Sequence, residues 1–301
     1  METIITSAFL KDNATAHLGN AIVCVIARLL VSPLLTPVEY LQLLPPFALA
    51  IFAFAYVFEI ANQVISEEED VINKPSRPIP AGLLTKAEAS QRWILSWSLL
   101  PTALCVVSGL QAGGYLIIWQ VWIALHYAWP RFNHWVMCNT FTAVGVTIQL
   151  NLLDTVITHA APAVQEVAFL NLALFLWFAL TVHVQEFPDI DGDRENGRRT
   201  LPLILSPKAV NCLRAGTGLF LIVEALIGLA VGIMMLCPDH RLIKIGLGIL
   251  HLVFATIVAT RLVVSSSREM DKMTYQCYYF LATYSMVLFY AQVAPLNRSW
   301  S

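Results

Sequence analysis

Long apolar segments dominate this chain, and they constrain its fold more than any other feature of the sequence. Nine stretches of roughly twenty residues are rich in aliphatic and aromatic side chains and carry almost no charge. Over the 301 residues, 57% are hydrophobic and 13% are charged, whereas an average soluble domain has about 25% charged residues. A water-soluble protein of this length needs more polar surface than that. The sequence therefore predicts a polytopic membrane protein.

The expected fold is an all-α, polytopic membrane bundle of about nine transmembrane helices around a central cavity. It forms a single domain over residues 1–301, with two pseudo-halves at roughly 16–156 and 157–296. The first predicted span carries Arg28 in its middle, so eight spans preceded by a re-entrant or interfacial helix is the alternative. The nine predicted spans are 18–36, 41–62, 92–111, 114–130, 134–156, 165–186, 209–236, 241–263 and 273–294.

Basic residues are distributed unequally between the loops. With nine spans, fourteen of the 18 Lys and Arg residues lie on the side of the N-terminus, and three lie on the opposite side. Both long polar loops lie on the basic side. By the positive-inside rule this side faces the cytosol. We therefore expect a multi-pass protein of an endomembrane, such as the endoplasmic reticulum, with its active site toward the cytosol.

Charge, cysteine spacing and the N-terminus give no sign of nucleic-acid binding, a metal-binding cysteine motif or a signal peptide. The net charge of −2 gives no sign of a nucleic-acid partner. The six cysteines are scattered without a CxxC pair, so they indicate neither a zinc site nor a disulfide framework. No basic region followed by a compact apolar core marks the N-terminus as a cleavable signal. The oligomeric state is unknown from the sequence.

The first polar cluster, "NQVISEEED", follows directly after an apolar run. Asn62, Ser66 and Asp70 are spaced i, i+4 and i+8, which places them on one face of a continuous helix. A second cluster, "HVQEFPDIDGDRENGRRTLP", ends the sixth span and spaces Asp189 and Asp193 by four residues. The Asp-Gly-Asp sequence within it also suits a turn, so the helix has a possible break there.

Carboxylates at the end of an apolar helix are costly unless they face water, a cation or a partner. Two clusters of hard oxygen ligands suit Mg²⁺, which is typically held by one or two carboxylates plus substrate phosphates. Solvated loop charges are the simpler alternative for either cluster alone. Two clusters at the same end of long spans, both followed by basic residues and proline, favour a site for a diphosphate head with a hydrocarbon tail. Basic residues near the clusters that can bind phosphate oxygens are Lys74, Arg77, Arg131, Arg194, Arg198 and Arg199.

The two segments resemble the signature motifs of the UbiA superfamily of intramembrane prenyltransferases. "NQVISEEEDVINKPSRPIPAG" is similar to the first aspartate-rich motif, NQxxDxxxD with a trailing NKPxxP segment. "EFPDIDGDRENGRRTLP" is similar to the second, KDxPDxxGDRxxGxxTLP. The resemblance covers nearly the whole chain. It implies a nine-helix bundle in a lipid bilayer that uses Mg²⁺ and a prenyl diphosphate.

The resemblance also implies roles for individual residues. Ser66 departs from the middle aspartate of the first motif, and serine is a poor Mg²⁺ ligand; Glu69 is the acid expected to compensate. Asp70, Asp189 and Asp193 are the expected catalytic residues. The expected metal ligands are Asn62, Glu69, Asp70, Glu186, Asp189 and Asp193. The expected diphosphate-binding residues are Lys74, Arg77, Tyr127, Arg131, Arg194 and Arg198.

Members of this family ionise an allylic diphosphate, and the fate of the carbocation divides them. The acid-rich first motif resembles the fungal secondary-metabolism branch, which includes membrane-bound terpene cyclases. We therefore expect a terpene cyclase acting on farnesyl or geranylgeranyl diphosphate, with Phe187, Trp122 and Tyr127 as possible cation-stabilising rings. An aromatic prenyltransferase is the alternative. A transporter is the rival from another class, but the sequence shows no inverted repeat, and both acidic clusters lie on the same side.

Overall fold

The computed structural model confirms the all-α class. Helices account for all the regular elements of the described chain apart from one isolated bridge between His134 and Arg199. The structure describes residues 2–11, 13–31, 36–128, 134–160, 167–195, 197–234, 241–265 and 267–293. The helices are α1 Glu2–Leu10, α2 Ala14–Val31, α3 Pro37–Ile65, α4 Glu67–Asn73, α5 Lys86–Ser108, α6 Leu110–Ala128, α7 Trp135–Ala160, α8 Val167–Thr181, the 3₁₀ helix η2 Val182–Glu186, α9 Ile190–Glu195, α10 Leu201–Ile204, α11 Pro207–Met234, α12 Arg241–Val264 and α13 Arg268–Val293.

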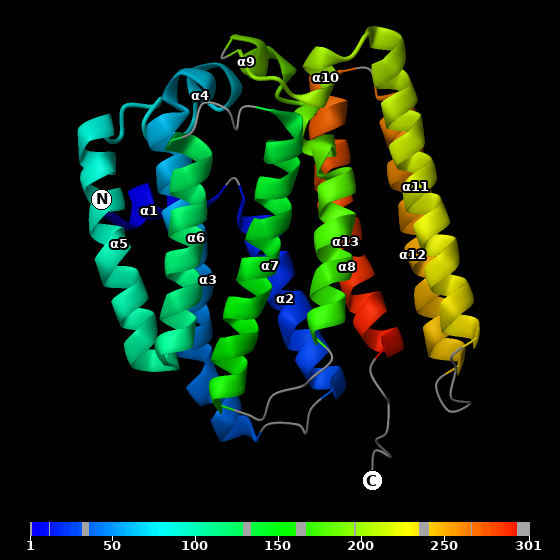
Figure 1. Ribbon diagram of the computed structural model, residues 1–301, viewed down its shortest axis with the longest axis horizontal. Coiled ribbons are helices and arrows are strands. Elements are labelled where there is room, and N and C mark those ends of the chain that lie inside the picture. Colours follow the sequence, from blue (N-terminus) through cyan, green and yellow to red (C-terminus); the bar gives the residue numbers. More distant parts are fainter. Residues whose placement is uncertain are drawn as a thin grey trace.

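Each predicted span overlaps one long helix, and these helices stand roughly side by side in the bundle (Figure 1). Four described helices are long and apolar enough to cross a membrane by length and composition: Pro37–Ile65, Trp135–His159, Pro207–Met234 and Ile245–Val264. The number of nine spans, and the division into two pseudo-halves, stay predictions. α2 covers most of the segment around Arg28, but the side chain of Arg28 lies outside the described part of the structure.

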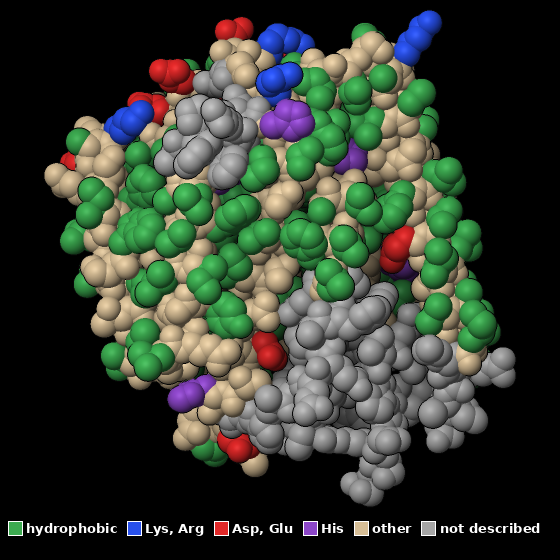
Figure 2. All heavy atoms as spheres, viewed as in Figure 1, with side chains coloured by type: hydrophobic (Ala, Val, Ile, Leu, Met, Phe, Trp, Pro, Cys, Tyr) green, Lys and Arg blue, Asp and Glu red, His purple; other side chains and the backbone are tan. Residues whose placement is uncertain are grey.

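The outer surface suits a bilayer. Large apolar side chains such as Ile94, Leu99 and Leu219 are exposed on the flanks of the helices. Figure 2 shows apolar side chains spread over the flank of the molecule, whereas Lys and Arg gather at the end that carries α4 and α9. In water such apolar surfaces would drive association between molecules, whereas in a bilayer the lipid tails contact them. The chain is an integral membrane protein.

Local sequence explains where α3 begins. Thr36 caps it: its hydroxyl accepts from the backbone N–H of Glu39, while the Glu39 carboxylate accepts from the N–H of Thr36 at 2.6 Å. This reciprocal pair is a capping box. Pro37 follows at a position where a missing N–H costs nothing. α3 therefore starts before the predicted boundary at residue 41 and continues through Pro45 and Pro46.

The helices that carry the acidic clusters are interrupted at the same end of the bundle. α3 ends at Ile65, and Ser66 (φ −97°, ψ 27°) separates it from the seven-residue α4. α8 similarly gives way to η2 and then to α9. α4 and α9 pack against each other at the top of Figure 1. The fold thus brings short polar helices from distant parts of the chain together above an apolar core.

Candidate active site

Arg198 links the two acidic clusters. It follows α9, and its Nη2 lies 2.6 Å from Oε2 of Glu69 on α4. Its Nη1 lies 3.6 Å from Oδ1 of Asp193 on α9. A second link joins Nζ of Lys74 to Oδ2 of Asp189 at 3.9 Å. The structure therefore gathers one polar site from two segments more than a hundred residues apart in the sequence.

Burial perturbs the charges of this site. It raises the pKa of Asp193 to about 7, a shift that Arg198 opposes and that Glu69 and Asp189 increase. Burial also raises the pKa of Glu69, against the attraction of Arg198 and Lys74. For Arg198, burial acts to lower the pKa, but the carboxylates of Glu69 and Asp193 outweigh it, so the net shift is upward. Perturbed acids and bases clustered in this way are typical of functional sites.

Two carboxylate oxygens near this cluster accept no hydrogen bond. Oδ1 of Asp193 and Oε1 of Glu186 are buried and have no hydrogen-bond partner. The other oxygen of Glu186 accepts from the backbone N–H of Leu201 at 3.1 Å. Within the described residues, no group of three or more His, Cys, Asp or Glu side chains is arranged to hold a metal ion by itself. Mg²⁺ needs no such cage, because waters and substrate phosphates complete its shell. The oxygens of Asp193 and Glu186 therefore fit such an ion.

An amide and a phenol border the cluster on its apolar side. Tyr127, near the end of α6, donates from Oη to Oδ1 of Asn62 at 2.7 Å. The hydroxyl of Ser66 donates to the same oxygen at 3.4 Å, and Nη2 of Arg198 lies 3.5 Å from that hydroxyl. Asn62, Ser66 and Tyr127 are thus connected to the Arg198 bridge. Arg131, which we expected beside Tyr127, lies outside the described residues.

The expectation of one continuous helix through Asn62, Ser66 and Asp70 is wrong. The break at Ser66 leaves Glu69 facing Arg198 and directs Asp70 toward Arg77. Nη1 of Arg77 donates to both carboxylate oxygens of Asp70, at 2.9 and 2.8 Å. Arg77 is only 1% exposed. It lies behind Asp70 instead of lining an open site for diphosphate, which differs from our expectation.

Sequence reasoning missed Glu59, which lies beside Arg77. This carboxylate sits in α3, is 0% exposed, and places Oε2 3.7 Å from Nη2 of Arg77. Its Oε1 accepts from Nδ2 of Asn13 at 2.6 Å. A signal was present in the sequence, since Glu59 is a lone carboxylate inside an apolar run. Such a group is tolerated in a bilayer only when it is paired.

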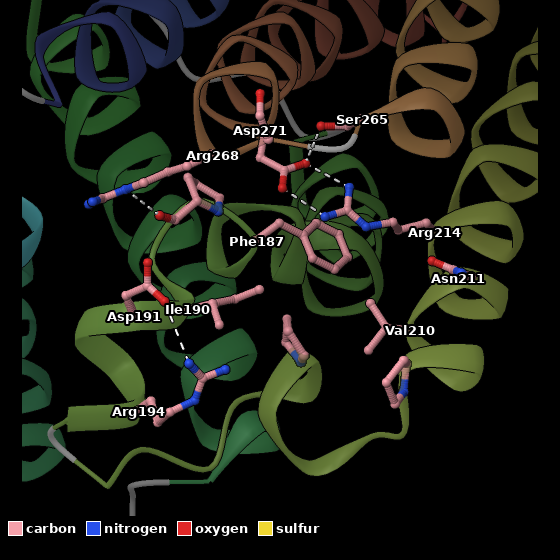
Figure 3. A pocket seen from close by; sticks show the side chains of 14 residues that line it. Phe187, Ile190, Asp191, Arg194, Val210, Asn211, Arg214, Ser265, Arg268 and Asp271 are labelled. Atoms are coloured by element: carbon pink, nitrogen blue, oxygen red, sulfur yellow. Dashed lines mark hydrogen bonds and ion pairs between the residues drawn. The ribbon is translucent and has the colours of Figure 1, made fainter.

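The other face of α9 borders a separate pocket of about 420 Å³ (Figure 3). Arg194 points into this region and pairs with Asp191, its Nη1 3.6 Å from Oδ1. Nε of Arg268 donates to the carbonyl of Pro188 at 3.0 Å on the same side. Arg194 therefore lines this pocket with Asp191, a different position from the diphosphate contact that we expected.

Phe187 also faces this pocket, and a protein cation covers its ring. Cζ of Arg214 lies 3.9 Å from the ring centroid. The same guanidinium donates to both oxygens of Asp271, at 2.6 and 2.8 Å (Figure 3). A ring face occupied by Arg214 is not open to a substrate carbocation. The position of Phe187 thus differs from the cation-stabilising role that we expected.

The remaining two expected rings lie in an aromatic cluster next to Asn62. The centroids of Trp122 and Tyr127 lie 6.3 and 6.1 Å from that of Phe141. Trp119 stacks on Phe141 at 5.4 Å, and Phe58, one turn before Asn62 on α3, lies 5.8 Å from both Trp119 and Phe141. The π-faces of such a cluster attract positive charge. Tyr127 joins this cluster to Asn62 of the polar site.

Comparison with known proteins agrees with this arrangement. The model of the UbiA prenyltransferase family matches residues 12–288. Polyprenyl transferase eriF of Hericium erinaceus is 30% identical over 247 residues, which cover 78% of this chain and 76% of that protein. Diterpene cyclase eriG of the same organism is 28% identical over 240 residues, covering 76% and 69%.

Among solved structures, a UbiA homologue from Archaeoglobus fulgidus bound to GPP and Mg²⁺ has the same fold. It superposes with a TM-score of 0.61 at 16% identity and covers 94% of this chain and 98% of its own. At this identity the likeness concerns the fold alone. The family-wide match and the two fungal relatives carry the assignment of the chain.

Proposed function

The chain belongs to the UbiA prenyltransferase family, and from that premise we propose that it is a membrane enzyme that ionises a prenyl diphosphate with the help of Mg²⁺. The observation that carries the proposal is the Arg198 bridge, which joins Glu69 of the first motif to Asp193 of the second. The mixture of carboxylates and cations suits a metal–diphosphate pair. The Archaeoglobus homologue, bound to GPP and Mg²⁺, supports the same assignment.

Mg²⁺ supplies Lewis-acid stabilisation to a departing diphosphate. We assign Glu69, Asp189 and Asp193 to hold the ion directly, with Asn62 and Glu186 as further oxygen ligands. Asp70 belongs to the same set in our assignment, and both of its oxygens also accept from Nη1 of Arg77. Glu69 and Asp70 lie on α4, Glu186 on η2 and Asp193 on α9, so short helices above a buried core carry most of these ligands.

Arg198 and Lys74 are assigned to the diphosphate. In the described structure they contact Glu69 and Asp189, so they already stand among the carboxylates that would hold the ion. A guanidinium offers five donors in a fixed fork, which matches the oxygens of a leaving diphosphate. Their donors stabilise the charge that develops as the carbon–oxygen bond breaks. Tyr127 adds a phenol at the edge next to the aromatic cluster.

After ionisation the site must keep water from the allylic cation. The aromatic cluster around Phe141 borders the polar site with largely apolar side chains that stack on one another. We assign the cation to capture by the substrate's own double bond, hence to a terpene cyclase that uses farnesyl or geranylgeranyl diphosphate. The diterpene cyclase eriG supports this reading. The similarity to the polyprenyl transferase eriF favours a second candidate, transfer of the prenyl group to an aromatic acceptor.

One experiment separates these candidates. Purified protein in detergent with Mg²⁺ is incubated with geranyl, farnesyl and geranylgeranyl diphosphate, each with and without phenolic acids. Hydrocarbon product without acceptor supports the cyclase, and product only with an acceptor supports the transferase. No release of diphosphate under any of these conditions refutes both. The position of the site at the basic end of the bundle supports an active site toward the cytosol. The endomembrane stays a prediction.

A further inference from the structure

Three buried charged side chains are in contact at the edge of the proposed metal site, and one of them, Asp70, belongs to the metal set. Arg77 is the middle member, with Asp70 on one side and Glu59 on the other. Each of the three side chains is at most 2% exposed. Asp70 and Arg77 belong to the polar motif, whereas Glu59 belongs to the regular part of α3. The proposed chemistry gives Glu59 no role.

The geometry of Arg77 calls for two anions. Nη1 donates to both oxygens of Asp70, and Nη2 forms an ion pair with Oε2 of Glu59 at 3.7 Å, a distance longer than a hydrogen bond. A guanidinium fixed at one end only rotates about its long stem, whereas a charge on each side locks it. Glu59 is itself held, because Nδ2 of Asn13 donates to its Oε1 at 2.6 Å. The chain of contacts thus runs from the N-terminal segment before α2 through α3 to α4.

α4 needs such an anchor. It has seven residues, and a helix this short is not stable alone. Backbone hydrogen bonds from the N–H of Ser66 to Asn62 and from that of Asp70 to Ser66 join it to the end of α3, and its Glu69 faces Arg198. The contact between Asp70 and Arg77 adds a buried side-chain link from α4 to a residue of the long helix, through Glu59.

We propose that Glu59 is a positioning residue for the metal site. Acting through Arg77, it fixes the carboxylate of Asp70 and the orientation in which α4 presents Glu69 to the second motif. The inference rests on the proposed function, since it assumes that α4 supplies ligands to a divalent cation. Glu59 touches neither the metal nor the substrate.

The test measures binding of Mn²⁺, as a probe for Mg²⁺, by electron paramagnetic resonance on folded protein in detergent without substrate. Glu59→Gln keeps the shape of the side chain and removes its charge. We expect its Kd for Mn²⁺ to rise at least about tenfold, and the Mg²⁺ concentration for half-maximal turnover to rise in parallel. Glu59→Asp keeps the charge and is expected to fall between Glu59→Gln and the wild type. A merely structural role would lower thermal stability without moving the Kd of the folded fraction.

Glu224→Gln is the matched control. Glu224 is also a carboxylate in a long helix, and it pairs with His251 at 3.1 Å away from the motifs. This variant is expected to keep the wild-type Kd. A wild-type Kd in folded Glu59→Gln would overturn the proposal, as would lost turnover with unchanged Mn²⁺ binding. If Glu59→Gln does not fold, the Kd of folded Glu59→Asp for Mn²⁺ is compared with that of the wild type, and an unchanged Kd would overturn the proposal. Failure of the wild type itself to bind Mn²⁺ or consume any prenyl diphosphate would refute the proposed function, and this inference with it.

Discussion

Replacing Arg198 by Gln should change metal binding and catalysis in opposite directions. In the described structure the guanidinium of Arg198 lies 2.6 Å from Glu69 and 3.6 Å from Asp193, where it neutralises carboxylates that we assign to the metal. Without substrate, Arg198 therefore competes with a divalent cation. With substrate, it is expected to bind the leaving diphosphate. Gln removes the charge and retains a shorter polar group.

The size of both effects follows from the geometry. Two unit charges 4 Å apart interact by about 4 kcal/mol at an effective dielectric constant of about 20. The side chain of Arg198 is 31% exposed, so solvent screening reduces its repulsion of a bound cation to about 1–2 kcal/mol. About 1.4 kcal/mol corresponds to a tenfold change, so Mn²⁺ should bind roughly tenfold more tightly. Loss of a donor to the departing charge should lower kcat/KM by roughly 10²–10³-fold.

Mn²⁺ titration by electron paramagnetic resonance and steady-state release of diphosphate measure the two effects on the same protein. Arg92→Gln is the matched control, because Arg92 is 26% exposed and pairs with Glu2 at 2.7 Å outside the site. It should leave both quantities unchanged. Weaker Mn²⁺ binding in Arg198→Gln, or a wild-type kcat/KM, would refute the assignment of Arg198 to the diphosphate.

The other predictions concern four further positions of the structure. Asp189→Ala and Asp193→Ala should each abolish diphosphate release while expression stays near wild type; wild-type activity in either removes it from the metal set. Asp271→Asn should destabilise the protein by about 3–5 kcal/mol, because it leaves the buried Arg214 without its bidentate partner; thermal unfolding followed by size-exclusion chromatography checks this. Ser66→Asp should be tolerated and should tighten Mn²⁺ binding, since the hydroxyl of Ser66 already faces the guanidinium that bridges the motifs; a misfolded product would contradict this.

The bundle was predictable because its dominant signal is the length of apolar runs. All nine predicted spans overlap long helices, and the boundaries differ by a few residues where capping decides them. Thr36 and Glu39, for example, start α3 earlier than hydropathy alone indicates. Hydropathy indicates which segment is removed from water, whereas the residue at which a helix begins depends on the side-chain oxygen that caps it.

The meeting of the two acidic clusters was also predictable, because both follow spans that end on the same side. The partners of individual side chains were not. Helical spacing placed Asp70 beside Asn62, but a single non-helical residue, Ser66, redirects it toward Arg77. Glu59 was overlooked because it lies outside the motif, although a carboxylate in an apolar run signals a buried partner. Residue spacing predicts which side chains share a face within one helix. It does not predict this across a helix break that the local sequence does not mark.

The charges around the Arg198 bridge also bear on the class of the protein. Glu69, Asp189 and Asp193 stand against Lys74 and Arg198, so the cluster is short of positive charge by about one unit when every carboxylate is ionised. A divalent cation alone turns the sum to about +1, and a prenyl diphosphate, which carries about three negative charges, alone turns it to about −4, whereas the diphosphate with two divalent cations brings it to about zero in a poorly solvated place. A transporter of simple cations needs no arginine between its carboxylates. An amphiphile that carries its negative charge at one end, and enters with its metal, matches both the polar cluster and the aromatic side chains next to it.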